Sequence, residues 1–189
     1  MLILASQSPR RSEILRQAGI AFAIRPARVD ESIRPGEAPE EYVKRVAQEK
    51  AAAIDADAAD IVLGADTVVV IDGEILGKPR DAADAIRMLE SLAGREHQVL
   101  TGISLRRGEE SLSDCAVTRV WFTPLARREI EEYVATGEPM DKAGAYAIQG
   151  LASRFIQRID GSYANVVGLP IELVSKNLRT FSDRRGVTQ

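Results

Sequence analysis

A run of eleven residues, Ile61–Ile71, constrains the fold of this chain more than any other segment. Its sequence, IVLGADTVVVI, is almost entirely apolar and rich in β-branched residues, which predicts a buried β-strand. The Asp72-Gly73 pair that follows is typical of a two-residue hairpin turn, so another strand is expected over residues 74–76. The segment therefore predicts part of a β-sheet in which one pair of strands is antiparallel.

The segments before this run alternate between strand and helix. Residues 1–5 predict a short strand, and Ser8 followed by Pro9 is typical of a helix start, with Gly19 as the end of that helix. Apolar residues at helical spacing predict another helix over residues 40–54. Similar signals predict helices that start at Asp81, Thr123 and Pro170, and strands at 98–105 and 115–122. This order predicts an α/β protein with a mixed, twisted sheet.

The length of the chain, 189 residues, predicts one domain over residues 1–182 followed by a polar tail at 183–189. Hydrophobic residues make up 45% and charged residues 28%, which is enough apolar material for a core. No stretch of about 18 apolar residues is present, so no membrane segment is expected.

The composition also bounds the compartment and the partners. Cys115 is the one cysteine and His97 the one histidine, so neither an intrachain disulfide nor a structural zinc site is expected. The single cysteine and the lack of a signal-peptide pattern predict the cytoplasm. A net charge of −3 argues against a large basic surface for a nucleic-acid polymer, and any bound anion is expected to be compact.

The first predicted helix carries cations where a carboxylate is expected. Arg10 and Arg11 occupy its second and third positions, although a helix N-terminus already carries about half a positive charge. Backbone N–H groups, the hydroxyls of Ser6 and Ser8, and the two guanidinium groups predict an anion site suited to phosphate. Alternatively, the arginines point to solvent or pair with acidic side chains such as Glu13.

Two further charges fall on positions predicted to be buried. Lys50 follows Val43 by seven residues and Val46 by four, so it lies on the apolar stripe of its helix. Either its ammonium group reaches solvent past the apolar surface, or it neutralises a polyphosphate. Asp66 interrupts the apolar run, and a buried carboxylate needs a cation, a metal or a proton. This favours a functional role over that of a structural carboxylate that caps a turn.

Two later features are weaker signals. Lys78 lies between Gly77 and Pro79, where it is either a surface lysine or a cation held in a fixed contact. Small residues in the segment 141–150 allow close backbone approach, and the amide of Gln149 can pair with the edge of a nucleobase. Glycine-rich turns before strands are common, so the segment by itself predicts little.

Seven motifs, taken in order, resemble the Maf family of nucleoside triphosphate pyrophosphatases. They are Ala5-Ser6-Gln7-Ser8-Pro9-Arg10-Arg11, Val29-Asp30-Glu31, Glu49-Lys50-Ala51, Gly64-Ala65-Asp66-Thr67-Val68-Val69, Gly77-Lys78-Pro79, Asp141-Lys142-Ala143-Gly144-Ala145-Tyr146 with Ile148-Gln149-Gly150, and Gly161-Ser162-Tyr163 with Val166-Val167-Gly168-Leu169-Pro170. The resemblance implies a metal-dependent cytosolic enzyme that cleaves a nucleoside triphosphate between the α and β phosphates. It also implies an elongated, ITPase-like fold with two lobes around a central cleft, often as a homodimer.

The resemblance implies roles for single residues as well. Ser-Pro-Arg-Arg, Gly-Ala-Asp-Thr and Ile-Gln-Gly are typical of the branch that acts on dTTP and UTP, with modified pyrimidine triphosphates as further candidates. Asp66 carries over as the proton acceptor, and Arg10, Thr67 and Gln149 as residues tied to base preference. Ala147 stands where the family has glycine, which leaves the fine preference open.

Charge balance supports this mechanism in outline. A triphosphate carries about four negative charges, which a Mg²⁺ or Mn²⁺ ion together with several cationic side chains can balance. Those side chains are Arg10, Arg11, Lys50 and Lys78. Glu31 is a candidate metal ligand beside Asp66, because hard divalent cations prefer carboxylate oxygens. Whether Asp66 takes the proton or holds the metal stays open.

Two functions from other classes compete with this reading. The first is a regulator of septation that binds a nucleotide without cleaving it. The second is an RNA-binding module that uses Arg10, Arg11 and the basic C-terminal residues, which the acidic balance and the few aromatic residues disfavour.

Overall fold

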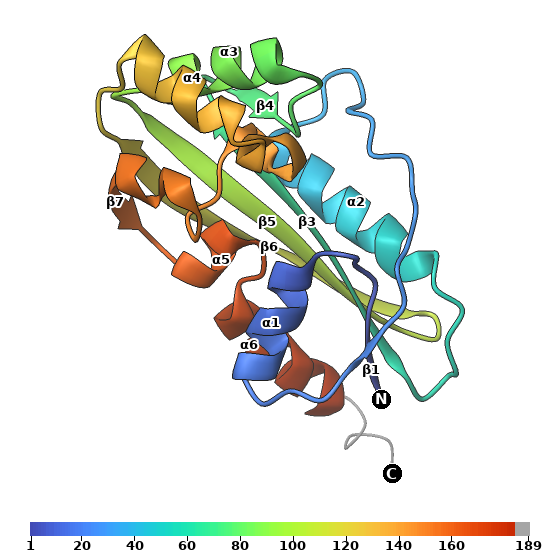
Figure 1. Ribbon diagram of the computed structural model, residues 1–189. Helices are drawn as coiled ribbons and strands as arrows, with labels where there is room; N and C mark the ends of the chain where they lie inside the picture. The colour runs from blue at the N-terminus through green and yellow to red at the C-terminus, as the bar shows by residue number, and fades with distance from the viewer. Residues whose placement is uncertain (184–189) are drawn as a thin grey trace. The chain divides into compact units, whose positions relative to one another are not determined.

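The computed structural model describes residues 1–183, which form a seven-stranded mixed sheet flanked by helices (Figure 1). The strands are β1 (Leu2–Leu4), β2 (Ala23–Ile24), β3 (Ile61–Ile71), β4 (Glu74–Leu76), β5 (Glu96–Arg107), β6 (Glu110–Phe122) and β7 (Ile156–Asp160). The helices are α1 (Pro9–Gln17), α2 (Pro39–Ala52), α3 (Ala82–Leu92), α4 (Arg127–Ala135), α5 (Tyr163–Val167) and α6 (Ile171–Asp183), with 3₁₀ turns at Glu138–Asp141, Ala143–Ala145 and Leu151–Phe155.

The sheet combines parallel and antiparallel pairs, as the sequence predicts. Its strand order is β2-β1-β3-β5-β6-β7, and β4 pairs with β3. Strand β1 runs parallel to both β2 and β3, whereas β4 is antiparallel to β3 and β7 is antiparallel to β6. The turn between β3 and β4 has Asp72 and Gly73 at φ of 52° and 81°, which is the left-handed geometry that this hairpin requires.

The described chain divides into two compact units. The first contains residues 1–66, 101–116 and 168–183, and the second contains residues 67–100 and 117–167. Strands β3, β5 and β6 contribute residues to both units.

In the first unit, α2 lies directly on the backbone of the sheet. A Cβ atom added to Gly64 of β3 would lie 2.0 Å from the carbonyl oxygen of Ala47, and one added to Gly102 of β5 would lie 2.3 Å from that of Val43. Side chains at these two strand positions would push the helix away, so glycine is required for the close approach. The close approach of the α2 backbone to Gly64 also brings the following turn of α2, which carries Lys50, near the middle of β3.

In the second unit, α3 and α4 pack together over a cluster of apolar and aromatic residues. Asp81 caps α3 by accepting a hydrogen bond from the backbone N–H of Asp84 at 2.8 Å, as predicted. Phe122, Tyr133, Tyr146 and Phe155 pack edge-on or tilted against one another at centroid distances of 4.8–6.3 Å. This cluster forms the core of the unit.

The predicted start of α4 is wrong. Thr123-Pro124 was expected to open this helix, but α4 begins at Arg127 with Ala126 as its N-cap. The N–H of Thr123 instead donates to the carbonyl oxygen of Phe155 at 2.8 Å, and its own carbonyl oxygen accepts from Gly94. Backbone pairing with distant segments therefore outweighs the local capping signal.

Strands β5 and β6 are also longer than predicted, at 12 and 13 residues. The ends of both strands carry polar and charged residues, so the apolar pattern covers only part of each strand. The predicted polar tail lies outside the described residues except for residue 183, which ends α6. Within residues 1–183, no helix combines the length and apolar character that crossing a membrane requires.

His97 predicts a pH dependence of stability in the second unit. Its side chain is 2% exposed, and Nε2 lies 2.8 Å from the hydroxyl of Tyr146. Burial lowers the pKa of His97 from 6.5 to about 4. Between these pH values the unfolded chain binds the proton and the folded chain does not, so the free energy of unfolding rises with pH. The expected gain from pH 4 to pH 7 is about 3 kcal/mol.

Urea denaturation at pH 7 and pH 5 checks this expectation. The variant His97→Gln removes the titrating ring and keeps a polar side chain near Tyr146. It should lose less stability than the unchanged protein when the pH falls from 7 to 5. An equal loss in both proteins would mean that His97 does not set this dependence.

Candidate active site

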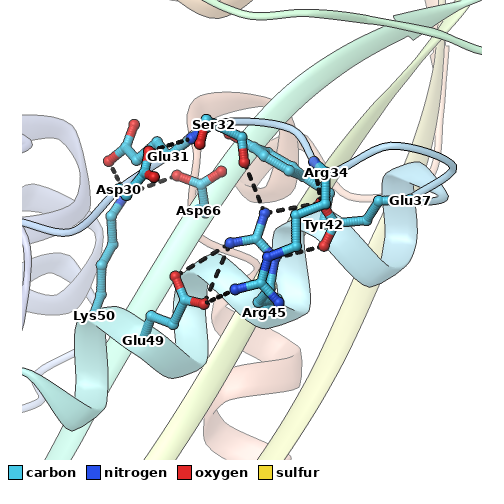
Figure 2. Close-up of polar contacts among 10 residues, drawn as sticks. All are labelled: Asp30, Glu31, Ser32, Arg34, Glu37, Tyr42, Arg45, Glu49, Lys50 and Asp66. Atoms are coloured by element: carbon cyan, nitrogen blue, oxygen red, sulfur yellow. Dashed lines mark hydrogen bonds and ion pairs between the residues drawn. The ribbon is translucent and has the colours of Figure 1, made fainter.

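The centre of the candidate site is a lysine held between two carboxylates (Figure 2). The Nζ atom of Lys50 lies 2.7 Å from Oδ1 of Asp66 and 2.6 Å from Oε1 of Glu31. The side chains of Lys50 and Asp66 are only 10% and 9% exposed, whereas that of Glu31 is 48% exposed. Lys50 therefore does not extend past the apolar surface to solvent, and Asp66 has the cationic partner that its burial requires.

Three separate segments supply these groups. Lys50 comes from the last turn of α2, Asp66 from the middle of β3, and Glu31 from the irregular segment between β2 and α2. The close packing of α2 at Gly64 accounts for the first two, because it brings the helix against the strand that carries Asp66.

The N-terminus of α1 adds two arginines to the same unit. Pro9 is the first helical residue, so Arg10 and Arg11 occupy the predicted positions, and the first turn contains no acidic residue. The guanidinium group of Arg11 donates to Oγ of Ser6 at 3.1 Å and to the carbonyl oxygen of Gly168 at 2.8 Å. Ser6 also accepts from the backbone N–H of Ser8 at 3.2 Å, which ties together the turn before the helix.

Electrostatics links this helix end to the carboxylates. Burial lowers the pKa of Arg11 from its ordinary value, attraction to Asp66 and Glu31 opposes that shift, and repulsion from Arg10 adds to it. Arg11 is therefore close enough to both carboxylates to interact with their charges. Glu13, the alternative partner considered for the arginines, forms an ion pair with Arg16 at 3.0 Å.

Three predicted site residues belong to the second unit. Thr67 follows Asp66 directly on β3 and is partly buried, whereas Lys78 and Gln149 are exposed. The backbone N–H of Gly144 donates to the carbonyl oxygen of Gly77 at 3.0 Å. This bond ties the turn that carries Lys78 to the glycine-rich segment that carries Gln149.

Sequence reasoning missed Tyr42 and Arg45, which contact the segment that carries Glu31. The hydroxyl of Tyr42 donates to the carbonyl oxygen of Glu31 at 2.8 Å, and Nη2 of Arg45 donates to that of Ser32 at 3.0 Å (Figure 2). One signal was available for the first of them. Tyr42 and Lys50 are eight residues apart on one helix, about two turns, so they lie on the same side of it.

Two carboxylates of the site, those of Glu31 and Asp66, are the groups that could hold a divalent cation. Among residues 1–183, no group of three or more His, Cys, Asp or Glu side chains is arranged to hold a metal ion. Mg²⁺ is commonly bound through one or two carboxylates, with phosphate oxygens and waters as its remaining ligands. Glu31 and Asp66, which converge on the same ammonium group, match that pattern.

Comparison with known proteins decides the family. The family model described as Maf-like protein matches residues 1–181. The chain belongs to the Maf family. A relative from Anaeromyxobacter sp. (strain Fw109-5), named dTTP/UTP pyrophosphatase, is 55% identical and is matched over 94% of this chain and 88% of its own length. A relative of the same name from Symbiobacterium thermophilum is 54% identical, over 95% of this chain and 93% of its own.

The Maf fold seen here also resembles a solved structure outside these relatives. The Ham1 protein of Staphylococcus aureus aligns with a TM-score of 0.53 at 14% identity, covering 95% of this chain and 98% of that one. At this level of identity the likeness concerns the fold alone. It agrees with the predicted mixed α/β architecture.

Proposed function

We propose that this chain is a nucleoside triphosphate pyrophosphatase that hydrolyses dTTP and UTP to the nucleoside monophosphate and pyrophosphate. Membership of the Maf family and the names of relatives at 54–55% identity support this activity. The observation that carries the proposal is the contact of the buried Lys50 with Asp66 and Glu31, because it joins three Maf motifs in one acidic and cationic centre.

In the proposed reaction, water attacks the α phosphorus and the bond to the oxygen that bridges the α and β phosphates breaks. Asp66 accepts a proton from the attacking water, and pyrophosphate leaves. Lys50 holds the carboxylate of Asp66 in place through their contact at 2.7 Å. Arg10 and Arg11 bind phosphate oxygens, with Arg11 oriented by Ser6 and Gly168.

The remaining assignments are proposals that follow the Maf motifs. Glu31 would hold a Mg²⁺ or Mn²⁺ ion, which neutralises phosphate charge when it is bound, and Asp66 is the alternative ligand if it does not accept the proton. Ser6 and Ser8 assist phosphate binding at the start of α1. Lys78 contributes a further cation, and Thr67 and Gln149 contribute to base preference. We also propose a homodimer in the cytoplasm. Cys115 has no role in the proposed reaction, because burial raises its pKa to about 12 and its thiol stays protonated at neutral pH.

A nucleotide panel tests the function. UTP, dTTP, CTP and GTP are incubated with the protein and Mg²⁺ or Mn²⁺, and pyrophosphate release is measured. We expect UTP and dTTP to be cleaved with a kcat/KM at least about tenfold above that for GTP, and no cleavage once EDTA has removed the metal.

The same panel separates the competing functions. Tight binding of UTP without pyrophosphate release would overturn the enzyme and support a nucleotide-binding regulator. A separate RNA-binding titration at increasing salt covers the third function: salt-dependent binding of RNA, with no nucleotide cleavage in the panel, would support an RNA-binding module.

A further inference from the structure

We propose that Tyr42 and Arg45 are positioning residues that hold Glu31 in place beside Lys50 and Asp66. This inference rests on the proposed function, because it concerns how that site obtains its second carboxylate. Neither residue belongs to the motifs on which the family resemblance is based.

Among Glu31, Lys50 and Asp66, only Glu31 lies outside a helix or strand. Lys50 lies on α2 and Asp66 on β3, so regular hydrogen bonding holds their backbones. Glu31 lies between β2 and α2, in a segment that begins after Ile24 and contains no helix or strand. Its side chain is also half exposed, so packing supplies little of what keeps its carboxylate at 2.6 Å from Lys50.

Tyr42 holds the residue itself. Its side chain is buried at 6% exposed, and its hydroxyl donates to the backbone carbonyl oxygen of Glu31 at 2.8 Å. A rigid ring on the first turns of α2 thus fixes the position of Glu31 relative to Lys50 on the same helix.

Arg45 holds the segment that follows Glu31. Its Nη2 atom donates to the carbonyl oxygen of Ser32 at 3.0 Å and to Oε2 of Glu37 at 2.8 Å, while Nη1 contacts both carboxylate oxygens of Glu49 at 3.2 and 3.3 Å. The hydrogen bond from Arg45 lowers the pKa of Glu37 to about 2, so the Glu37 carboxylate stays charged even in mildly acidic solution. Figure 2 shows the guanidinium group between the loop and the helix.

Arg34 closes the network from the loop side. Its guanidinium group binds Oε1 of Glu49 at 2.9 Å, and its backbone N–H donates to Oε2 of Glu37 at 3.1 Å. Loop residues on both sides of Ser32 are therefore tied to α2. Because the network contacts the backbone of Glu31 and of Ser32 and not the carboxylate of Glu31, it acts on catalysis through the position of Glu31.

A double-mutant cycle tests this positioning role. Tyr42→Phe removes the hydroxyl and keeps the ring, and Arg45→Met removes the guanidinium group; each is made alone and together with Glu31→Gln. Lys44→Met is the control, because Lys44 is the neighbouring cation on α2 and forms an exposed pair with Glu40. Two quantities are measured: kcat for UTP, and the affinity for Mn²⁺ in the presence of α,β-methylene-UTP, from the paramagnetic resonance signal of free Mn²⁺.

We expect Tyr42→Phe and Arg45→Met each to weaken Mn²⁺ binding about tenfold, as Glu31→Gln does, with less than a twofold effect from Lys44→Met. In the Glu31→Gln background, neither substitution should weaken Mn²⁺ binding by more than about twofold further. The reason is that each substitution acts through the carboxylate of Glu31, which this background lacks. Equal effects in both backgrounds, or no effect in the unchanged background, would overturn the proposal.

Backbone amide hydrogen exchange, measured without nucleotide, separates this proposal from the proposed function. The amide hydrogens of residues 29–37 should exchange faster in Tyr42→Phe and Arg45→Met than in Lys44→Met. If the unchanged protein releases no pyrophosphate while exchange and Mn²⁺ binding behave as expected, the proposed function fails and the positioning role stands. If the protein releases pyrophosphate but the effects of Tyr42→Phe and Arg45→Met on Mn²⁺ affinity add to that of Glu31→Gln, the positioning role is wrong and the proposed function stands.

Discussion

Asp66→Asn is expected to lower kcat for UTP hydrolysis by about 100-fold or more. Asparagine keeps the shape of the side chain but can neither accept the proton from water nor supply a negative charge, and a general base commonly contributes a factor of 10² to 10⁴. The fold should persist, because Lys50 keeps its contact with Glu31 at 2.6 Å. Pyrophosphate release at saturating UTP and Mg²⁺ measures the effect.

A matched control and a metal titration sharpen this test. Asp72→Asn makes the same substitution directly after β3, at an exposed residue paired with Arg95. Asparagine tolerates its φ of 52°, so turnover should change little. If the loss in Asp66→Asn persists at high Mg²⁺, Asp66 accepts the proton; recovery would assign it to the metal. Near-full turnover of Asp66→Asn at ordinary Mg²⁺ would remove Asp66 from the mechanism.

Gly64→Ala is expected to lower the free energy of unfolding by about 3 kcal/mol or more, because its Cβ atom would lie 2.0 Å from the backbone carbonyl oxygen of Ala47. A backbone atom cannot move aside as a flexible side chain can, so α2 would have to shift away from β3. The melting temperature should fall by about 6–12 °C. Any protein that remains folded should also lose activity, because the shift separates Lys50 from Asp66.

Gly77→Ala provides the comparison for stability. A Cβ atom at Gly77 meets no heavy atom within 4 Å, so its unfolding free energy should change by less than about 0.5 kcal/mol. Thermal unfolding of the two variants measures the difference. If Gly64→Ala were as stable as Gly77→Ala, the close approach of α2 to β3 would be contradicted.

Much of the local structure followed from short-range signals. The apolar run and the Asp72-Gly73 turn predicted β3 and its hairpin with β4, and Ser8-Pro9 with Gly19 predicted α1. These signals work because an apolar β-branched run, a proline at the first helical position and a left-handed turn are each properties of a few consecutive residues. They failed where a distant segment competed, as at Thr123, whose N–H binds Phe155.

The sequence by itself determined that two charges, Lys50 and Asp66, lie where apolar residues are expected, and that the first helix begins with two arginines. The resemblance to the Maf motifs assigned Glu31, Lys50 and Asp66 to one site, but only the tertiary structure decided which of their atoms meet. Residues 31, 50 and 66 converge because α2 packs on a strand glycine and because Tyr42 and Arg45 hold an irregular loop. Such contacts depend on how separate elements pack in space, and hydrophobic periodicity within one element carries no information about that packing.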